Sequence, residues 1–550
     1  MASTSREIPG EGLSNILSNR SGHIRYIDPT NNAGDEDLLA QIGYKQELNR
    51  KYSTLQVFGI AFSIMGLLPS ISSTVILGLE CGTGGLVWGW LVAGLFIFCV
   101  GFSLSVLGSA IPTSGGLFYY ANYYCPEKVR VPLSFIVGCS NTLGLTSGFM
   151  SILYGFSVQI LAVVSIASDG TFEITNPKIY GVFVAGVVFA TVITCISTKH
   201  GAWLQTISIV VNVFLVLLFL IAVPVGVSRR GYGFNNASFI FGNFENFRQY
   251  PTGFSFILAL TPAVWTIGAY DSAIHCAEEA RNAQRAIPWG ILGSITACWV
   301  IGWIICIVFA ACIQDGDVLR MITTDTGSPV SQLIYDALGK EWAMAFMSLI
   351  AFGQMLMAIS IMIALSRQVW SFARDDGLPI VYKYVKYIDP RIKVPIRASM
   401  FAGCLATAIG MLILIPGYAG AGALFSLAII SQSLSFATGV FLIMVTKHGA
   451  NVFKPGPFYF GKKIVNTVHV ITLVWTAAIV LVAMFPDDVP ANKESMNYAV
   501  VVNVGVWILS FIYYLIHGHK AYSGPKSNIS DEYLAEHDIE IREEHHVEKS

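Results

Sequence analysis

The stretch LTPAVWTIGAYDS, at residues 260–272, interrupts a long apolar segment of the chain. Pro262 lacks the backbone N–H that a continuing helix needs, and Gly268 is a poor helix former. Asp271 adds an acidic side chain, which is costly inside a bilayer unless it faces water, a partner or a ligand. We therefore expect a membrane helix that is broken within this stretch.

A matching interruption lies earlier in the chain, in the stretch GIAFSIMGLLPS at residues 59–70. Gly66 and Pro69 lie near the middle of an apolar segment, and a proline inside a straight helix costs roughly 3 kcal/mol. Proline and glycine also produce simple kinks in membrane helices. Two interruptions at corresponding places nevertheless favour a shared role, so we expect the backbone to be unwound at both.

The composition places these stretches in a membrane. Of the 550 residues, 54% are hydrophobic and only 12% are charged, and the mean hydropathy is +0.62. A soluble chain carries roughly 25% charged residues, so lipid must account for the missing charge. The formal net charge of −1 offers no field that would attract nucleic acid. The 10 cysteines form no CxxC pair, so we expect neither disulfides nor a metal site or other cofactor.

A helix that crosses the bilayer core needs about 20 apolar residues. By this criterion the chain is predicted to be an all-α polytopic membrane protein with about twelve spans. The spans are expected near residues 57–79, 85–110, 132–165, 179–198, 203–226, 254–276, 288–313, 343–366, 397–415, 421–445, 465–484 and 497–518.

The distribution of Lys and Arg predicts the orientation, because these residues are retained on the cytoplasmic side. With the N-terminus inside, most of them fall in cytoplasmic loops, and the even number of spans puts both termini on that side. We expect a cytoplasmic N-terminal tail at 1–56, a membrane domain at 57–518 and a cytoplasmic C-terminal tail at 519–550.

The two interruptions divide the membrane domain into halves that each begin with a broken helix. The halves are residues 57–226 and 254–445, and two further helices follow at 465–518. This arrangement is typical of inverted-repeat secondary transporters. An unwound turn frees N–H groups, which favour a carboxylate, and C=O groups, which favour an ammonium group. We therefore expect a zwitterionic solute to suit the site.

Asp271 is the leading single candidate for a functional residue, because an ionised group at this depth needs a partner. The alternative is that its carboxylate caps the second half-helix. His275 and Glu279 share a helix face through their i, i+4 spacing. Partly dehydrated carboxylates and imidazoles change charge near neutral pH, so this face is a candidate carrier of a coupling proton.

Glu278 and Glu279 are better explained as part of a cytoplasmic gate, in which Glu278 or Glu279 pairs with an arginine from another loop. The stretch SRQVWSFARDDGLP, at residues 366–379, continues the eighth span as a basic amphipathic segment. Its arginines, beginning with Arg367, are expected either to anchor at the inner membrane surface or to hold the gate acids.

The other polar residues inside the spans are expected mostly to form interhelical hydrogen bonds, which are worth roughly 0.6 kcal/mol each. They are Tyr120, Asn141, Gln159, Asn212, Gln354 and Gln432. Among them, Tyr120 and Asn212 are further candidates for a gate or coupling role. Tyr120 closes a stretch in which Gly115 and Gly116 allow a tight bend after the second span.

Motifs of catalysis and of ATP use are missing from the sequence. It contains no GxxxxGK[ST] phosphate loop, no HExxH zinc motif and no GxSxG nucleophile turn. We therefore expect neither an enzyme nor an ATP-driven pump. An ion channel needs a continuous polar pore, whereas the polar residues here are sparse and cluster at the breaks.

At these residues the chain resembles fungal amino-acid permeases of the amino acid, polyamine and organocation superfamily, in the amino acid/choline branch. The resemblance extends from about residue 38 to residue 530 and rests on the segments 41–48, 53–70, 111–120, 262–279 and 366–379. It implies a leucine-transporter-like fold of twelve helices with two inverted five-helix repeats, and a substrate bound at the unwound parts of spans one and six.

The resemblance also implies roles for individual residues. A substrate carboxylate would meet backbone N–H groups of Ser63, Met65 and Gly66. The opposite side, which receives the amino end, would be lined by Trp265, Ile267, Gly268 and Asp271. Some relatives carry a lysine in the fifth span as a surrogate for the coupling ion, but this chain has none between Trp203 and Val223 and offers Asn212 instead.

The expected function is therefore import of GABA or a related small amino acid by a secondary transporter that is coupled to protons. Relatives in this branch also carry choline, polyamines or thiamine, which keeps an organic cation as an alternative substrate. A non-transporting nutrient sensor on the same fold is the third alternative. We expect the plasma membrane as the location, with the vacuolar or another internal membrane as the alternative.

Overall fold

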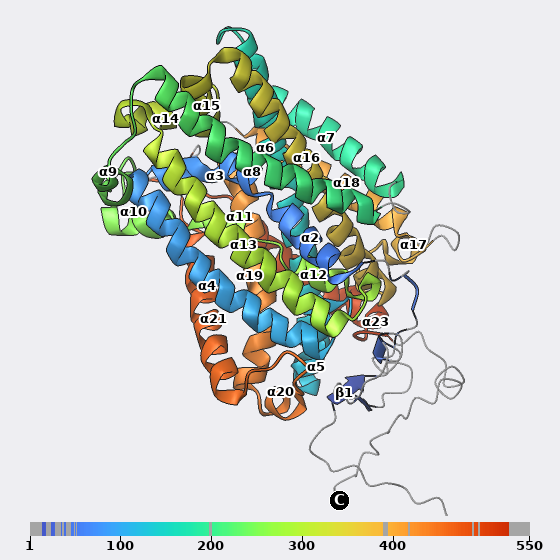
Figure 1. The fold of residues 1–550 in the computed structure, drawn as a ribbon. Coiled ribbons are helices and arrows are strands. Elements are labelled where there is room, and N and C mark those ends of the chain that lie inside the picture. The colour runs from blue at the N-terminus through green and yellow to red at the C-terminus, as the bar shows by residue number, and fades with distance from the viewer. Residues whose placement is uncertain are drawn as a thin grey trace, which may run out of the picture.

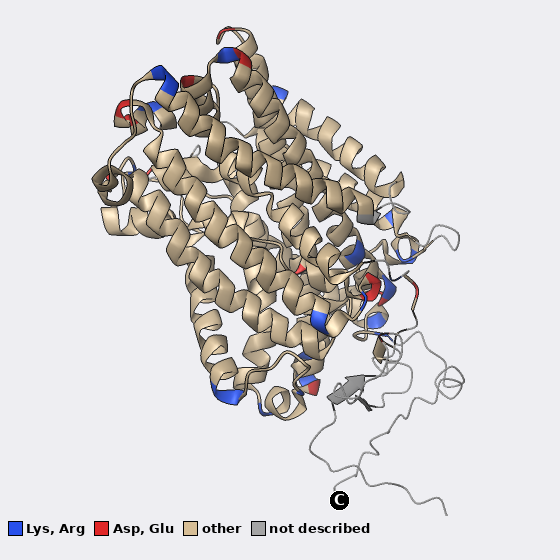
Figure 2. Ribbon diagram, in the orientation of Figure 1, with Lys and Arg blue, Asp and Glu red and all other residues tan. Residues whose placement is uncertain are grey.

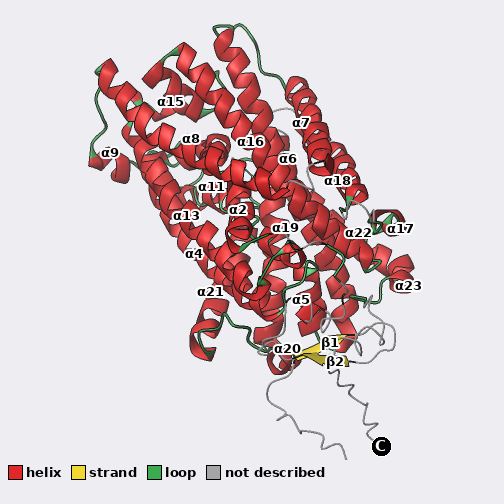
Figure 3. Cartoon of the chain, turned by 45° about the vertical axis from the view of Figure 1, so that its right-hand side comes forward, coloured by secondary structure: helices red, strands yellow, loops and turns green. Residues whose placement is uncertain are grey.

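The computed structural model is almost entirely helical (Figures 1 and 3). It describes residues 14–17, 24–27, 35, 38–39, 44, 46–48, 50, 52–196, 201–388, 394–415, 419–486, 489–492 and 495–526. Much of the predicted N-terminal tail and all of the C-terminal tail after residue 526 lie outside the described residues.

The first half of the membrane domain follows the predicted spans closely. Its helices are α2 (Thr54–Met65), α3 (Leu67–Leu79), α4 (Gly82–Ala110), α6 (Glu127–Ala167), α7 (Asn176–Ile196) and α8 (Gly201–Arg230). Between α4 and α6 lies the short helix α5 (Gly116–Tyr124), and Gly116 has a positive φ of 45° at its start. The predicted tight bend after the second span is therefore present.

The second half begins with three short helices, α10 (Thr252–Leu258), α11 (Thr261–Thr266) and α12 (Ser272–His275). The remaining long helices are α13 (Ala283–Ala311), α16 (Lys340–Arg374), α18 (Ile396–Ile409), α19 (Ala419–Val445), α21 (Lys462–Val482) and α22 (Ala499–Tyr513). Eleven helices in the described part of the chain are long and apolar enough to cross a membrane, counting α2 with α3. The broken sixth span, α10 to α12, supplies the twelfth predicted span.

Shorter elements connect the spans. They are α9 (Ala237–Gly242), η2 (Ala277–Glu279), η3 (Gln314–Gly316), α14 (Val318–Ile322), α15 (Pro329–Leu338), α17 (Tyr382–Val385), η4 (Gly410–Leu414), α20 (Lys447–Val452), η5 (Tyr514–Gly518) and α23 (His519–Ala521). In the N-terminal tail, β1 (Ser14–Leu17) and β2 (Ile24–Ile27) pair as an antiparallel ribbon in which Ser14 lies opposite Ile27. The ribbon lies outside the helical bundle (Figure 3).

The first span is broken at Gly66, as predicted. Gly66 has φ 37° and ψ 70°, a left-handed conformation that ends α2 and starts α3. L-residues with a Cβ adopt this conformation at a cost of about 1–2 kcal/mol. The side chain of Met357 from α16 also occupies the space in which a Cβ at Gly66 would lie, with its Sδ only 2.0 Å from that position. Glycine is therefore required here twice over.

The sixth span is broken between Thr266 and Ser272, also as predicted. Ile267 ends α11 with φ −90° and ψ 48°, and Ala269 has a positive φ of 54°. Both breaks lie in helices that pack against α4 and α16 within the bundle. Charged side chains gather at the two ends of the bundle and leave its middle almost free of charge (Figure 2). This distribution matches a chain that spans a bilayer.

Candidate functional site

A cavity lies beside the break in the sixth span. It encloses about 660 Å³, including its opening, and residues from seven spans line it. The polar and aromatic lining residues are Ser70, Trp265, Thr266, Tyr270, Gln432, Ser433, Phe436, Trp475 and Thr476. No Asp, Glu, Lys or Arg is among the lining residues, so the cavity is polar in places but carries no net charge.

The backbone at the break supplies both kinds of hydrogen-bonding group to this cavity. Within the described chain, the N–H groups of Gly268, Ala269 and Tyr270 have no hydrogen-bond acceptor. The carbonyl oxygens of Val264 and Trp265, at the end of α11, likewise receive no backbone donor. Unpaired groups of this kind are costly when they are buried, so the break favours a polar ligand or water.

The predicted lining residues divide into two groups. Trp265, Ile267 and Gly268 line the cavity as expected from their positions in the sixth span. Asp271 does not appear in its lining, and neither do the three residues predicted from the first span, which contributes Ile64 and Ser70 instead.

The break in the first span offers different N–H groups from the predicted ones. The N–H of Gly66 donates to the Phe62 carbonyl oxygen at 3.1 Å, and Ser63 and Met65 lie inside α2. In the described chain, the N–H groups without an acceptor are those of Leu67 and Leu68, the first residues of α3. The reason is helix geometry: N–H groups before the break bond to the preceding turn of α2, whereas the first N–H groups of α3 have no preceding turn to bond to.

Asp271 lies one turn further along the sixth span, in a buried polar cluster. It occupies the N-cap position of α12, but its carboxylate makes no capping hydrogen bond, so the capping alternative is wrong. Its Oδ2 lies 3.2 Å from Nε2 of His275, and neither side chain is exposed. The same Nε2 lies 2.9 Å from the side-chain amide of Asn141 in α6.

The hydrogen bonds around His275 restrict where protons can lie. Its Nδ1 lies 3.0 Å from the Ser114 carbonyl oxygen, which only accepts, so Nδ1 carries a hydrogen. Nε2 then has two neighbours, so it either accepts a hydrogen bond from the Asn141 amide nitrogen or carries a hydrogen that Asp271 accepts.

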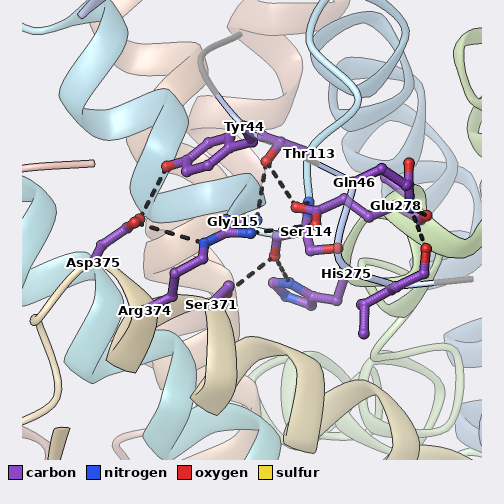
Figure 4. A network of polar contacts seen from close by, with 12 residues as sticks. Tyr44, Gln46, Thr113, Ser114, Gly115, His275, Glu278, Ser371, Arg374 and Asp375 are labelled. Carbon is purple, nitrogen blue, oxygen red and sulfur yellow. Dashed lines mark hydrogen bonds and ion pairs between the residues drawn. The ribbon is translucent and has the colours of Figure 1, made fainter. Parts of the chain in front are cut away.

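Two buried ion pairs join the sixth span to the end of α16. Glu279 accepts from Nε of Arg367 at 2.8 Å, and Oε2 of Glu278 lies 3.3 Å from Nη1 of Arg374. Their side chains are at most 8% exposed. The arginines of the amphipathic segment therefore pair with Glu278 and Glu279 rather than anchoring at the membrane surface. The other oxygen of Glu278 accepts from the N–H of Ser114 at 3.2 Å (Figure 4).

Segments from both tails cover these ion pairs. The hydroxyl of Tyr44 donates to Asp375 at 3.0 Å, and the Tyr44 ring lies 3.9 Å from the guanidinium of Arg374 (Figure 4). From the C-terminal side, the N–H of Lys526 donates to Asp375 at 3.3 Å. Burial raises the pKa of the Asp375 carboxyl to about 7. We call this end of the bundle, defined by Tyr44, Asp375 and Lys526, the tail-proximal end.

A second cavity of about 500 Å³, also including its opening, lies on the other side of Trp265. Trp265 and Ile429 line both cavities. The Trp265 indole donates to Ser151 at 2.9 Å and packs edge-on against Phe425, with ring centroids 4.8 Å apart. Arg248, which lines the second cavity, pairs with Glu80. The side chains of Trp265 and Ile429 therefore lie at the boundary of the two spaces.

Tyr120 and Asn212 have local partners away from this cluster. The Tyr120 hydroxyl donates to the Ile111 carbonyl oxygen at 2.9 Å and so fixes the bend before α5. The Asn212 amide donates to the Ser208 carbonyl oxygen at 2.9 Å within α8. Neither residue lines a described cavity. A gate or coupling role for Tyr120 and Asn212 therefore stays a prediction.

Comparison with known proteins gives a consistent set of relatives. The sequence model of an amino acid permease family matches residues 52–506. The chain is 46% identical over 529 residues to the GABA-specific permease of Saccharomyces cerevisiae, covering 95% of this chain and 92% of that protein. It is 32% identical to an uncharacterised amino-acid permease of Schizosaccharomyces pombe, covering 90% of each chain. Amino-acid permease 2 of Neurospora crassa is 30% identical, with 90% and 89% covered.

Proposed function

Because the chain belongs to the amino acid permease family, we propose that it carries GABA or a related small amino acid across a membrane as a proton-coupled secondary transporter. The similarity to a GABA-specific permease, which covers nearly the whole length of both chains, points to this substrate. The cavity at the break of the sixth span is the proposed binding site.

The uncharged lining of the cavity is the observation that carries this proposal. Moving a net charge into a buried site without a partner is very costly, whereas a zwitterion brings both charges and no net charge. The unpaired N–H groups of Gly268 to Tyr270 suit its carboxylate, and the unpaired carbonyl oxygens of Val264 and Trp265 suit its ammonium group.

The closed tail-proximal end supports alternating access. The ion pairs of Glu278 and Glu279 shut this end, while the second cavity leads from Trp265 toward the opposite end of the bundle. Separating either pair would leave a buried charge unpaired, at a cost of about 3–5 kcal/mol. We propose that these pairs are the cytoplasmic gate and that Trp265 closes the other side of the substrate cavity during the cycle.

Asp271 and His275 are the proposed coupling site. Their side chains lie 3.2 Å apart, directly after the substrate-binding break and on the short helix that leads to Glu278. Movement of the sixth span on substrate binding would therefore change the surroundings of a proton held between them. This assignment needs no lysine in the fifth span.

The remaining expectations extend the same proposal. Residues 57–226 and 254–445 would form the two inverted repeats, each opening with a broken helix. Both tails would lie in the cytoplasm, and the plasma membrane is the proposed location.

Aromatic rings in the cavity favour one alternative substrate. Trp265, Tyr270, Phe436 and Trp475 line it together, and aromatic side chains attract quaternary ammonium groups such as that of choline. The cavity lacks the acidic side chain that would balance such a cation, since Asp271 is engaged by His275.

Uptake of labelled GABA in a host that lacks its own amino-acid permeases tests the proposal. Unlabelled choline, putrescine, thiamine and neutral α-amino acids serve as competitors. Saturable GABA uptake at acidic external pH, insensitive to choline, supports it. If the protein takes up choline or putrescine but not GABA, the substrate is an organic cation instead of GABA. A surface-localised protein that carries none of these compounds would contradict the proposal.

A further inference from the structure

Gln432, in α19, differs from two other buried glutamines of the membrane domain, Gln159 and Gln354. The amide of Gln159 donates to the Pro69 carbonyl oxygen at 3.1 Å, and that of Gln354 donates to the Ile152 carbonyl oxygen at 3.0 Å. Gln432 is 6% exposed, against 1% for Gln159 and 0% for Gln354, and within the described chain its amide has no hydrogen-bond partner. It lines the cavity, so its free polar atoms face the space that a ligand would occupy.

Three glycines leave room for this side chain. A Cβ at Gly144 would lie 2.8 Å from Cγ of Gln432, and one at Gly148 would lie 3.7 Å from its Nε2. On the opposite wall, a Cβ at Gly268 would lie 3.7 Å from its Oε1. The side chain of Gln432 therefore extends from α19 past α6 and presents its oxygen to the break in the sixth span.

Three oxygens meet at this side of Gly268. The position that a Cβ would take there is 2.8 Å from the carbonyl oxygen of Trp265, 3.4 Å from that of Val264 and 3.7 Å from Oε1 of Gln432. None of the three receives a hydrogen bond from the described chain. A primary ammonium group has three N–H donors, which matches three acceptors, whereas a trimethylammonium group has none.

We infer that Gln432 is a specificity-determining residue, which accepts a hydrogen bond from the primary ammonium group of the substrate and so discriminates against N-methylated amines. This inference rests on the proposed substrate site. A site with polar groups that only the correct ligand satisfies rejects analogues strongly, by up to about 10⁴-fold. The two backbone carbonyls alone cannot satisfy the third donor, so discrimination depends on this side chain.

The test measures ligand binding to the purified full-length protein in lipid nanodiscs, independently of transport. The ligands are GABA, putrescine and their fully N-methylated counterparts, and binding is followed by the ligand-induced rise in Tm. We expect the wild-type protein to prefer the primary amines by about 100-fold or more. Gln432→Met, which keeps the volume and removes the amide, should reduce this preference by about 10-fold or more.

A matched control is Gln354→Met, because Gln354 is a buried glutamine that bonds to protein and lies outside the cavity lining. It should lower Tm and leave the preference unchanged. If Gln432→Met does not fold, Gln432→Asn provides the second variant. Asn retracts the oxygen by one methylene, so binding should shift from GABA toward 5-aminopentanoate, which is one methylene longer.

The outcomes separate this inference from the proposed function. Wild-type protein that binds putrescine and ignores GABA would overturn the proposed substrate and leave the role of Gln432 intact. Equal binding of primary and N-methylated ligands, no binding of any primary amine, or Gln432 variants that keep the wild-type preference would overturn the inference.

Discussion

Nε2 of His275 lies 3.2 Å from Oδ2 of Asp271, one helical turn earlier, and both side chains are completely buried. The His275 imidazole lies beside Asp271 through Nε2, and its other nitrogen, Nδ1, donates to the Ser114 carbonyl oxygen. A buried proton held between two such groups is a natural carrier of coupling. The pair directly follows the break that faces the cavity.

Asp271→Asn should uncouple transport from the proton gradient. At one proton per substrate, a gradient of about two pH units supports roughly 100-fold accumulation, because each tenfold ratio corresponds to about 1.4 kcal/mol. The variant lacks the carboxylate of the proposed coupling site, so in proteoliposomes it should equilibrate labelled GABA without accumulating it, while GABA–GABA exchange continues.

His469→Gln is the control for this variant, since His469 is another fully buried histidine, bonded to Ser103 at 2.9 Å and remote from the cavity lining. It should accumulate GABA as the wild type does. Full accumulation by Asp271→Asn would remove Asp271 from the coupling site.

Arg374→Gln should open the tail-proximal gate. The substitution leaves Glu278 buried without its cation, which costs the closed state about 3–5 kcal/mol. Cys276, fully buried beside this gate, is a native reporter. A membrane-impermeant maleimide, followed by peptide mass spectrometry, should modify Cys276 in the variant and leave it unmodified in the wild type.

Lys340→Gln is the matched control for the gate, because Lys340 pairs with Asp169 near the surface, where ion pairs contribute little. Cys276 should stay protected in this variant. Equal protection of Cys276 in Arg374→Gln and wild type would mean that the ion pair does not hold the gate.

Gly66→Ala should destabilise the protein and impair transport. The left-handed conformation costs alanine about 1–2 kcal/mol, and its Cβ would overlap the side chain of Met357. Thermal unfolding should show a lower Tm than that of Gly181→Ala, where a Cβ meets no atom within 4 Å. Met357→Ala should restore part of the loss in the double variant. A Gly66→Ala protein as stable as Gly181→Ala would show that the break is not required.

The fold was largely predictable, because its signals are local. Gly268 and Gly66 mark the two breaks in the sequence itself, and the lengths of apolar segments give the spans. The i, i+4 spacing predicts a shared helix face for His275 and Glu279, but α12 ends at His275. His275 lies beside Asp271 instead, while Glu279 pairs with Arg367. Arg367 could be named as a candidate partner of the acids, but which arginine pairs with Glu278 and which with Glu279 depends on how the spans pack.

The cavity lining was less predictable. Gln432 looks like any other buried glutamine in sequence, because nothing local shows whether its amide faces a helix or a cavity. Its role depends on three glycines from two other spans. Likewise, only the observed helix end shows that the free N–H groups of the first break belong to Leu67 and Leu68.

Asp375 should make stability depend on pH. Burial raises the pKa of its carboxyl to about 7 in the folded protein, above the usual value of 3.8. The folded state therefore binds the proton more tightly than the unfolded state, so this group lowers the free energy of unfolding as pH rises between these two values. Asp375→Asn should flatten the fall in Tm between about pH 4 and pH 7. An unchanged pH dependence of Tm in this variant would assign the effect to other groups.

The most direct test of the central claim is accumulation of labelled GABA by purified wild-type protein in proteoliposomes with an imposed proton gradient. With an acidic exterior, internal GABA should rise above the external concentration, and a protonophore should return it to equilibrium. GABA that reaches the same internal level with and without the gradient would contradict proton-coupled transport by this chain.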